Sequence, residues 1–459
     1  MHETTQRDGE ATMPGRLRGY ADGLLTILRG TDDRALTQRG ALIAFAIRVA
    51  GAGLAYLSQA LLARWMGSFE YGIFVFVWVW VLVLGGLAPL GLSTACVRFV
   101  AEYRETGRLA LLRGLLLGSR AMTVACATVM MFAALGLLHL FADSLTGYYW
   151  LPAFLILFCL PIYALVDVQE GICRGYSWIT LALAPQYVLR PLLLLALLLG
   201  AGAIGYQLSA VTAAVCAVIA YWATGMLQLF LLERNVARDM APGERAYDLR
   251  LWITTALPLL LVIGFELLLQ NTDILVLSRY LEPQQVAVYF AALKTIGLMS
   301  FVHFAVGTAA GRHFSACKAQ GDGERLAEAV RDSVRWTFWP SLAGAVLLLA
   351  LGRPLLWLFG PEFVEGYPVM FILVIGFLVR ASMGPAEYVL NMLGEQNRCA
   401  AVLSLAALTN VALNFALVPH FGIYGAASAT AVSVGGASIA MLLVARARLG
   451  LDLFIGRRG

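Results

Sequence analysis

The chain has 459 residues, of which 60% are apolar and only 13% are charged, against about 25% charged in an average soluble protein. The net charge of +5 is modest, so charge gives no reason to expect a nucleic-acid partner. With a mean hydropathy of +0.78, the composition excludes an ordinary soluble enzyme and indicates a polytopic membrane protein.

The first segment, residues 1–38, is polar and has no apolar core followed by a small-residue cleavage site. We therefore interpret it as a tail and not as a cleaved signal peptide. Tyr20, Leu24 and Leu28 recur every four residues, which leaves open either a short interfacial helix or a frayed tail.

Apolar stretches of a length that crosses a bilayer follow this tail to the end of the chain. They predict an all-α membrane protein with about 12 transmembrane helices. The predicted spans are residues 40–63, 71–92, 114–138, 149–168, 177–199, 205–231, 251–275, 286–310, 336–357, 367–390, 399–419 and 423–445.

The connections between these spans differ in charge. Nearly all basic residues outside the spans fall in one alternate set of connections, and the other set carries only Arg64, Arg279 and Arg353. Positively charged connections face the cytoplasm. Both termini are therefore predicted to be cytoplasmic.

The chain also divides into two halves of six spans. Residues 63–74 resemble residues 278–289, which suggests a duplication. Six spans preserve direction, so the halves should be related by a pseudo-two-fold along the membrane normal, with a pathway between them. The expected organisation is a tail (1–38), an N-lobe (39–231), a linker (232–250), a C-lobe (251–448) and a second tail (449–459).

Four basic side chains lie deep inside predicted spans, namely Arg48, Arg190, Lys294 and Arg380. An ionisable group at bilayer depth costs roughly 2.5 to 3.5 kcal/mol, so we expect these four to face a water-filled cavity. Small or polar residues follow Arg48 and Arg380 at positions i+4, i+7 and i+11, which extends a polar face along each helix.

Two further features bear on these cations. Gln186 precedes Arg190 and Pro191 follows it, where a local break is expected to open the helix. Each cation could instead form a structural ion pair, for example Arg380 with Glu387.

Acidic residues form a second set of candidates. Glu266, Gln270 and Asp273 recur at i, i+4 and i+7 on one helix face, and their carboxylates could bind Na⁺ or a proton. Glu387 joins them as a candidate coupling or gating residue. Pairing with an embedded arginine is the alternative role, and for Asp273 simple solvation near the outer end is another.

Two further sets of polar residues lie in predicted spans, one at the end of a span and one inside a span. Asp167, Glu170 and Arg174 share a face at a predicted cytoplasmic end and form either a cytoplasmic gate or a solvated rim. Asn410 and Asn414 are expected to make interhelical hydrogen bonds.

Sequence motifs of catalysis and metal binding are absent. Neither lysine follows a glycine, which excludes a Walker A loop. No HExxH, GxSxG or paired-histidine spacing occurs, and the seven cysteines have no CxxC pair. We expect no enzyme activity, no metal site and no cofactor, with Na⁺ or H⁺ coupling left open.

Several motifs carry a family resemblance: residues 63–72, residues 91–103, residues 273–279, LFG at 358–360, LNMLG at 390–394 and GIYGAA at 422–427. In this order and spacing they resemble polysaccharide flippases of the O-antigen (Wzx) type, within the multidrug/oligosaccharidyl-lipid/polysaccharide (MOP) exporter superfamily. The resemblance covers about residues 36–448.

This resemblance implies a V-shaped bundle of two six-helix lobes around a cationic cavity. It implies alternating-access transport of a polyprenyl-diphosphate-linked oligosaccharide from the cytoplasmic to the periplasmic leaflet of a bacterial inner membrane. The implied partners are the lipid-linked glycan, membrane lipids, a glycan polymerase and other export proteins. Drug exporters of the superfamily often carry an acidic residue in the first span, where this chain has Arg48.

Two other functions stay open from the sequence. A cation-coupled exporter of small molecules would use Glu266 and Asp273. A membrane enzyme such as a glycan polymerase usually needs a sizeable external loop, whereas the predicted outside connections are short.

Overall fold

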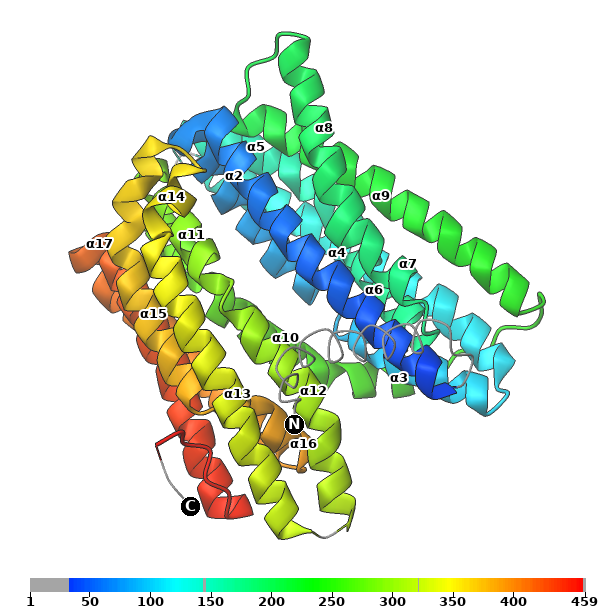
Figure 1. Ribbon diagram of the computed structural model, residues 1–459. Coiled ribbons are helices and arrows are strands. Elements are labelled where there is room, and N and C mark those ends of the chain that lie inside the picture. The colour runs from blue at the N-terminus through cyan, green and yellow to red at the C-terminus, as the bar shows by residue number, and fades with distance from the viewer. Residues whose placement is uncertain (1–32, 143–145, 321, 457–459) are drawn as a thin grey trace, which may run out of the picture.

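The computed structural model describes residues 33–142, 146–320 and 322–456, and all regular elements in these ranges are helices (Figure 1). The N-terminal tail lies mostly outside the described residues, and with it the proposed interfacial helix at residues 20–28. The all-α prediction is confirmed.

The N-terminal half consists of helices that precede a connection at residues 240–248. They are α2 (Asp33–Leu87), α3 (Leu92–Glu105), α4 (Leu109–Leu140), α5 (Gly147–Ile156), η2 (Leu157–Cys159), α6 (Leu160–Gly175), α7 (Ile179–Ala184), the π-helical turn η3 (Pro185–Leu189), α8 (Arg190–Ala203) and α9 (Ala210–Asp239).

The C-terminal half follows that connection. Its helices are α10 (Leu249–Tyr280), α11 (Pro283–Gly297), α12 (Ser300–Gln320), α13 (Gly323–Ala350), α14 (Gly352–Trp357), η4 (Pro361–Gly366), α15 (Tyr367–Ser382), α16 (Ala386–Met392) and α17 (Gln396–Leu449).

The longest helices, α2 and α17, each contain two predicted spans joined at a glycine. The chain turns at Gly67, with φ 77° and ψ 163°, and at Gly422, with φ 56° and ψ −132°. Glycine adopts these positive φ values without the steric penalty of a side chain. A single residue therefore reverses the chain at each of these positions.

The number of spans agrees with the sequence. Nine helical segments of the described chain are long and apolar enough to cross a membrane. Two of them, 46–105 and 396–449, hold two predicted spans each, and α13, whose first half is charged, carries the remaining one. The prediction of an all-α membrane fold with about 12 spans is confirmed.

The two halves meet at one end of the molecule and diverge toward the other (Figure 1). At the first, which we call the closed end, a Cβ built on Gly72 of α2 would overlap the carbonyl oxygen of Pro283 of α11. Only glycine permits this approach of the two backbones. Nearby, the hydroxyls of Tyr56 and Thr295 lie 3.0 Å apart.

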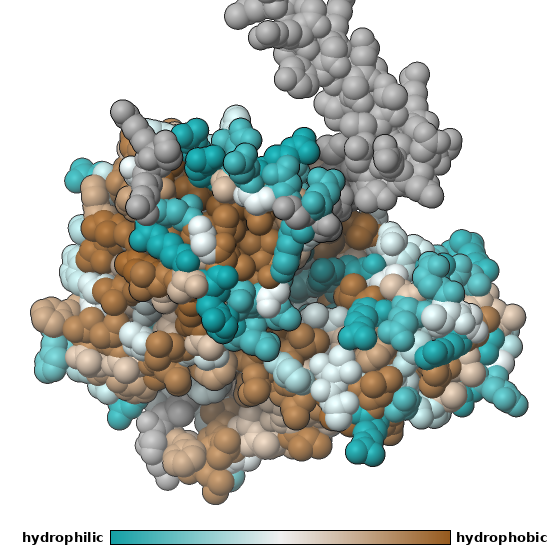
Figure 2. All heavy atoms as spheres, turned by 90° about the horizontal axis from the view of Figure 1, so that it is seen from below, coloured by the Kyte–Doolittle hydropathy of each residue, from teal (hydrophilic) through white to brown (hydrophobic). Residues whose placement is uncertain are grey.

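At the opposite end, which we call the open end, hydrophilic residues gather around a recess in the face, with apolar residues exposed among and beside them (Figure 2). Helix α10 connects the halves here. Near its start, the indole nitrogen of Trp252 donates to the Tyr103 hydroxyl at 3.1 Å, whereas its last turns are buried and pack on α17. One helix therefore contacts both halves.

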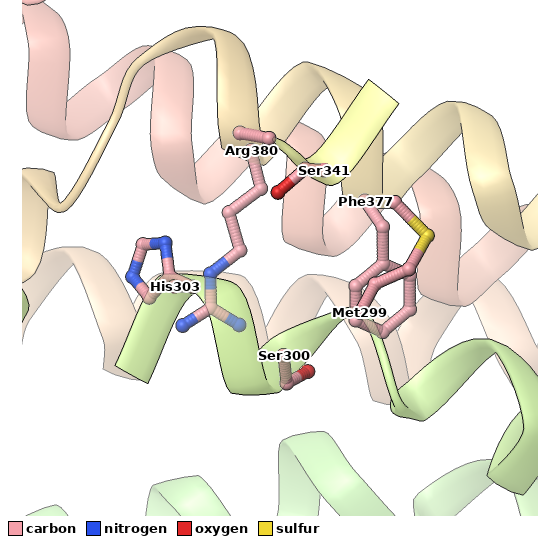
Figure 3. Close-up of a pocket in the computed structure, with 7 residues that line it drawn as sticks. Met299, Ser300, His303, Ser341, Phe377 and Arg380 are labelled. Carbon is pink, nitrogen blue, oxygen red and sulfur yellow. The ribbon is translucent and has the colours of Figure 1, made fainter. Parts of the chain in front are cut away.

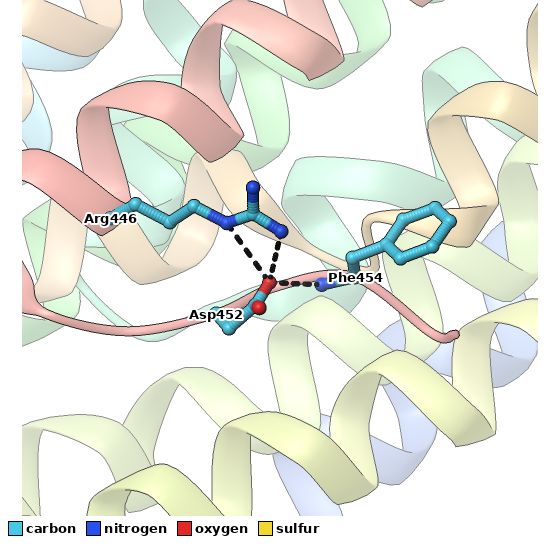
Figure 4. Close-up of polar contacts among 3 residues, drawn as sticks. All are labelled: Arg446, Asp452 and Phe454. Carbon is cyan, nitrogen blue, oxygen red and sulfur yellow. Dashed lines mark hydrogen bonds and ion pairs between the residues drawn. The ribbon is translucent and has the colours of Figure 1, made fainter. Parts of the chain in front are cut away.

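The segments outside the spans are packed onto the helices. In the connection between the halves, the Ala246 amide donates to the Ala110 carbonyl of α4 at 2.9 Å. After α17, Asp452 accepts hydrogen bonds from Arg446 at 2.8 Å and from the Phe454 amide at 3.1 Å (Figure 4). The expected C-terminal tail therefore folds back on the C-terminal half, as far as the described residues extend.

Candidate functional site

Arg380 is the centre of a charged cluster in the C-terminal half. It lies near the end of α15, and its Nη2 is 3.9 Å from Oε2 of Glu387 on α16. Glu266 of α10 interacts electrostatically with both residues. The two paired side chains are 32% and 30% exposed, so the ion pair named as an alternative for Arg380 is present, and the pair still borders open space.

A small pocket adjoins Arg380, with a volume of about 10 Å³, which is room for about one water-sized group. In Figure 3 the guanidinium extends toward α12, between His303 and Ser300, and the Ser341 hydroxyl lies beside its aliphatic chain. His303 is 8% exposed, and neither of its ring nitrogens has a hydrogen-bond partner. The lining residues are Met299, Ser300, His303, Ser341, Phe377, Arg380 and Ala381.

Two interruptions of helical structure border this pocket. One separates α11 from α12, and the other separates α15 from α16 at Gly384, where φ is 60°. Short-range bonds satisfy the freed backbone groups, from the Met299 amide to the Ile296 carbonyl at 2.9 Å and from the Met383 amide to the Arg380 carbonyl at 3.2 Å. Irregular backbone at membrane depth is tolerated where it is buried in protein or lines a cavity.

Arg48 of α2 reaches the C-terminal half. Its guanidinium carbon lies 4.7 Å from the centre of the Phe304 ring of α12. It also interacts electrostatically with Tyr388 and with Glu170. Arg48 and Arg380 therefore both approach the space beside α12, one from each half.

Arg190 occupies a separate pocket within the N-terminal half. It follows the π-helical turn η3, so the helix is irregular just before Arg190, whereas the break expected at Pro191 is absent and α8 continues through that residue. Its guanidinium carbon lies 4.3 Å from the centre of the Tyr221 ring, and Gln186 and Gln228 also line the pocket. π-helical turns are frequent at functional sites.

Lys294 lies on α11 and is exposed, although the residues around it on that helix are almost all buried. Its Nζ is 4.9 Å from the centre of the Phe290 ring. Within the described chain, Lys294, Arg48 and Arg190 have no carboxylate partner at ion-pair distance. Arg380 is thus the paired one of the four predicted cations.

The acidic stripe on α10 is divided between two environments. Glu266 faces the Arg380 cluster, Gln270 is exposed, and Asp273 is only 2% exposed. Asp273 accepts hydrogen bonds from the Tyr289 hydroxyl at 2.7 Å and the Ile274 amide at 2.8 Å. Solvation of Asp273 near the outer end is therefore wrong, because the last turns of α10 pack on α17.

The predicted gate residues make contacts within the N-terminal half. Arg174 Nη1 lies 3.8 Å from Oε1 of Glu170, one turn away on α6, and Asp167 accepts a hydrogen bond from the Ser93 side chain of α3. These contacts leave the predicted gate as a hypothesis.

The asparagine pair differs from expectation. Asn414 donates to the Asn410 carbonyl and side-chain oxygens at 2.9 and 3.1 Å, so these bonds lie within α17 and are not interhelical. The prediction of interhelical bonds was wrong, because asparagines one turn apart bond within the helix, and Asn410 Nδ2 and Asn414 Oδ1 remain without a hydrogen-bond partner.

His303, Ser300, Ser341 and Tyr221 contribute to these pockets and were not found from the sequence. His303 carried a usable signal, because an ionisable side chain inside a span is a functional candidate in the same way as Lys294. Serine and tyrosine are too common in membrane helices to stand out by residue type alone.

Comparisons with known proteins give two family matches. The polysaccharide biosynthesis protein family matches residues 37–310, which is more than half of the chain. The MatE family matches residues 258–416.

A relative and solved structures cover most of the chain. An uncharacterized membrane protein of Methanocaldococcus jannaschii is 23% identical over 406 residues, 83% of this chain and 78% of that protein. An inward-facing multidrug resistance MATE family transporter of the MOP superfamily superimposes with a TM-score of 0.69 at 16% identity, covering 88% and 94% of the two chains. A MOP superfamily transporter from Pyrococcus furiosus, described as having a binding pocket of reverse polarity, gives 0.67 at 17% identity, covering 93% and 97%.

Proposed function

The chain belongs to the polysaccharide biosynthesis protein family and to the MOP superfamily of exporters, and from that premise we propose that it flips a polyprenyl-diphosphate-linked oligosaccharide between membrane leaflets. The family and the fold are those of transporters and not of enzymes. The proposed direction is from the cytoplasmic to the periplasmic leaflet of a bacterial inner membrane, with both termini cytoplasmic and export proteins such as a glycan polymerase as partners.

The unpaired cations carry this proposal. Arg48, Arg190 and Lys294 lie over aromatic rings and have no described carboxylate at ion-pair distance. An unpaired charge in a membrane helix is costly, whereas a diphosphate would supply the missing anionic partner. Guanidinium groups suit this role because their paired N–H donors match phosphate oxygens.

The arrangement of the halves supports transport by alternating access. The closed end is held by contacts between α2 and α11, while the open end is hollowed (Figure 2). Rocking of the two halves would open the closed end and close the open end, with the polyprenyl chain remaining in lipid. An inside-negative potential would drive an anion outward by about 2.3 kcal/mol per charge per 100 mV.

The experiment is transport of a short-chain polyprenyl-diphosphate oligosaccharide by the purified protein in liposomes. We expect Arg190→Gln and Lys294→Gln each to lower the initial rate at least tenfold, because each removes a charge-assisted phosphate contact worth roughly 1.5 to 3 kcal/mol. Arg279→Gln is the control, since Arg279 is an exposed residue at the end of α10. Full activity of both cavity variants would refute the assignment.

A cation-coupled small-molecule exporter is the second candidate. It is favoured by the MatE match, whose residues include Glu266, Asp273 and Glu387, and by the burial of Asp273. In this function Asp273 would bind the coupling Na⁺ or proton inside the C-terminal half. Drug resistance that depends on a sodium or proton gradient and is lost in Asp273→Asn would establish it.

A further inference from the structure

The pocket beside Arg380 differs in chemistry from the unpaired cations, and the geometry points to a different ligand group. We propose that His303, Ser300, Ser341, Arg380 and Glu387 form a subsite for the hydroxyl or acetamido groups of a sugar. This inference rests on the proposed function. It assigns the sugar to the pocket beside Arg380 and the diphosphate to the unpaired cations.

His303 gives the strongest indication. Its side chain lines the pocket, is 8% exposed, and has no hydrogen-bond partner at either ring nitrogen. A neutral imidazole carries one N–H donor and one acceptor nitrogen. A ligand that both donates and accepts, such as a hydroxyl or an acetamido group, satisfies both atoms, whereas a phosphate or carboxylate oxygen only accepts.

The charges around the pocket lead to the same ligand class. Glu387 pairs with Arg380 at 3.9 Å, and Glu266 interacts electrostatically with that pair. Two carboxylates beside one guanidinium repel an anionic group, which would have to displace Glu387 to reach Arg380. The same carboxylates accept hydrogen bonds from hydroxyls, and Arg380 donates to oxygen atoms.

The pocket suits one polar group of a sugar, such as a hydroxyl, because its volume is only about 10 Å³. Phe377 lines the pocket together with the hydroxyl-bearing Ser300 and Ser341. The Tyr388 ring lies 6.3 Å from the His303 ring, between centres. Small-molecule sites typically combine apolar and aromatic walls with a few placed polar groups, and a sugar presents both kinds of surface.

The unpaired cations and the pocket beside Arg380 would then bind different parts of one substrate. The unpaired Arg48 approaches the same space from α2, over Phe304 of α12, so it stands at the boundary between them. A diphosphate held by Arg48 would bring the first sugar of the glycan toward His303. The sugar subsite therefore selects a glycosylated carrier over the bare lipid diphosphate.

The test compares two probes on the purified full-length protein in nanodiscs, farnesyl diphosphate and farnesyl diphosphate bearing one N-acetylhexosamine. We expect the wild type to bind the glycosylated probe at least about tenfold more tightly, the effect of two neutral hydrogen bonds. Binding of the sugar-free probe tests the diphosphate site independently.

His303→Phe retains a ring against Tyr388 and removes both nitrogens, and Ser341→Ala is a second variant with minimal change in volume. We expect both to reduce the preference for the glycosylated probe, His303→Phe to within about twofold, without weakening binding of the sugar-free probe. That unchanged affinity shows that the variants are folded. His420→Phe, at an exposed histidine of α17, is the control and keeps the full preference.

Three results would overturn the inference. If both variants keep the wild-type preference, these side chains do not bind the sugar. If the wild type binds both probes equally, no sugar subsite exists, while the diphosphate proposal stands. If the wild type binds neither probe, the proposed function fails and the subsite with it.

Discussion

Arg380 and Glu387 form an ion pair across an interruption of the helix that the sequence predicts to be continuous. Their charged atoms lie 3.9 Å apart, although α15 ends at Ser382 and α16 begins at Ala386. Seven residues apart on one helix, they would also share a face. The two side chains therefore pair as they would on a continuous helix. The break between α15 and α16 also frees backbone N–H and C=O groups beside the pocket.

We expect Glu387→Gln to impair transport more than stability. Both side chains are about a third exposed, so the pair contributes less than about 1 kcal/mol to the free energy of unfolding. In Glu387→Gln, a sugar hydroxyl loses its hydrogen bond to a charged carboxylate. Such a bond is worth roughly 1.5 to 3 kcal/mol, so the transport rate should fall about tenfold or more. Melting temperature and liposome transport measure the two effects.

Glu365→Gln is the matched control, because Glu365 is exposed in η4. It should leave both quantities unchanged. A Glu387→Gln protein that melts far below the wild type and transports normally would show that this ion pair is structural.

The sequence predicts the membrane architecture well because bilayer thickness imposes helix length. The predicted connections at residues 64–70 and 420–422 contain the observed reversals at Gly67 and Gly422. The sequence predicts less well where a span is interrupted. It does not predict the breaks between α11 and α12 and between α15 and α16, because the apolar stretch continues across each break.

The candidate site is predicted in part, and for a clear reason. Ionisable residues inside spans are visible by their cost in lipid, which identified Arg48, Arg190, Lys294 and Arg380. Which of them are paired depends on tertiary contacts between distant segments. Glu266 reaches Arg380 from another helix, and no periodicity in the chain encodes that distance.

The closed end should loosen when the Tyr56 hydroxyl is removed. This hydroxyl lies 3.0 Å from the Thr295 hydroxyl and donates to the Leu355 carbonyl at 3.4 Å, so it joins the two halves. Tyr56→Phe loses about 0.5 to 1.5 kcal/mol, which raises the population open at this end about two- to tenfold. Distances between spin labels on the two halves report that population.

The control for this change is Tyr148→Phe, since the Tyr148 ring contacts Phe69 and Tyr149, all within the N-terminal half. It should leave the distance distribution unchanged. Identical distributions for Tyr56→Phe and the wild type would show that other contacts hold the closed end.

Gly72→Ala should disrupt the contact between α2 and α11. The added Cβ would overlap the Pro283 carbonyl oxygen, and overpacking of this kind typically costs about 1 to 3 kcal/mol. Gly136 of α4 has open space around its Cα, so Gly136→Ala should be neutral or stabilise by up to about 1 kcal/mol. Thermal melting compares them, and equal melting temperatures would contradict a tight approach at Gly72.

Substitutions of Tyr221 separate the role of its ring from that of its hydroxyl. The ring lies under the Arg190 guanidinium, while the buried hydroxyl has no hydrogen-bond partner. Tyr221→Phe should therefore keep full transport, because the ring still attracts the cation. Tyr221→Leu removes the cation–π attraction on Arg190, which is roughly 0.5 to 2 kcal/mol. The guanidinium is then no longer held in place, so transport should fall severalfold. Equal transport by the two variants would show that Arg190 is positioned by its own helix, through the π-helical turn before it, and not by the aromatic ring.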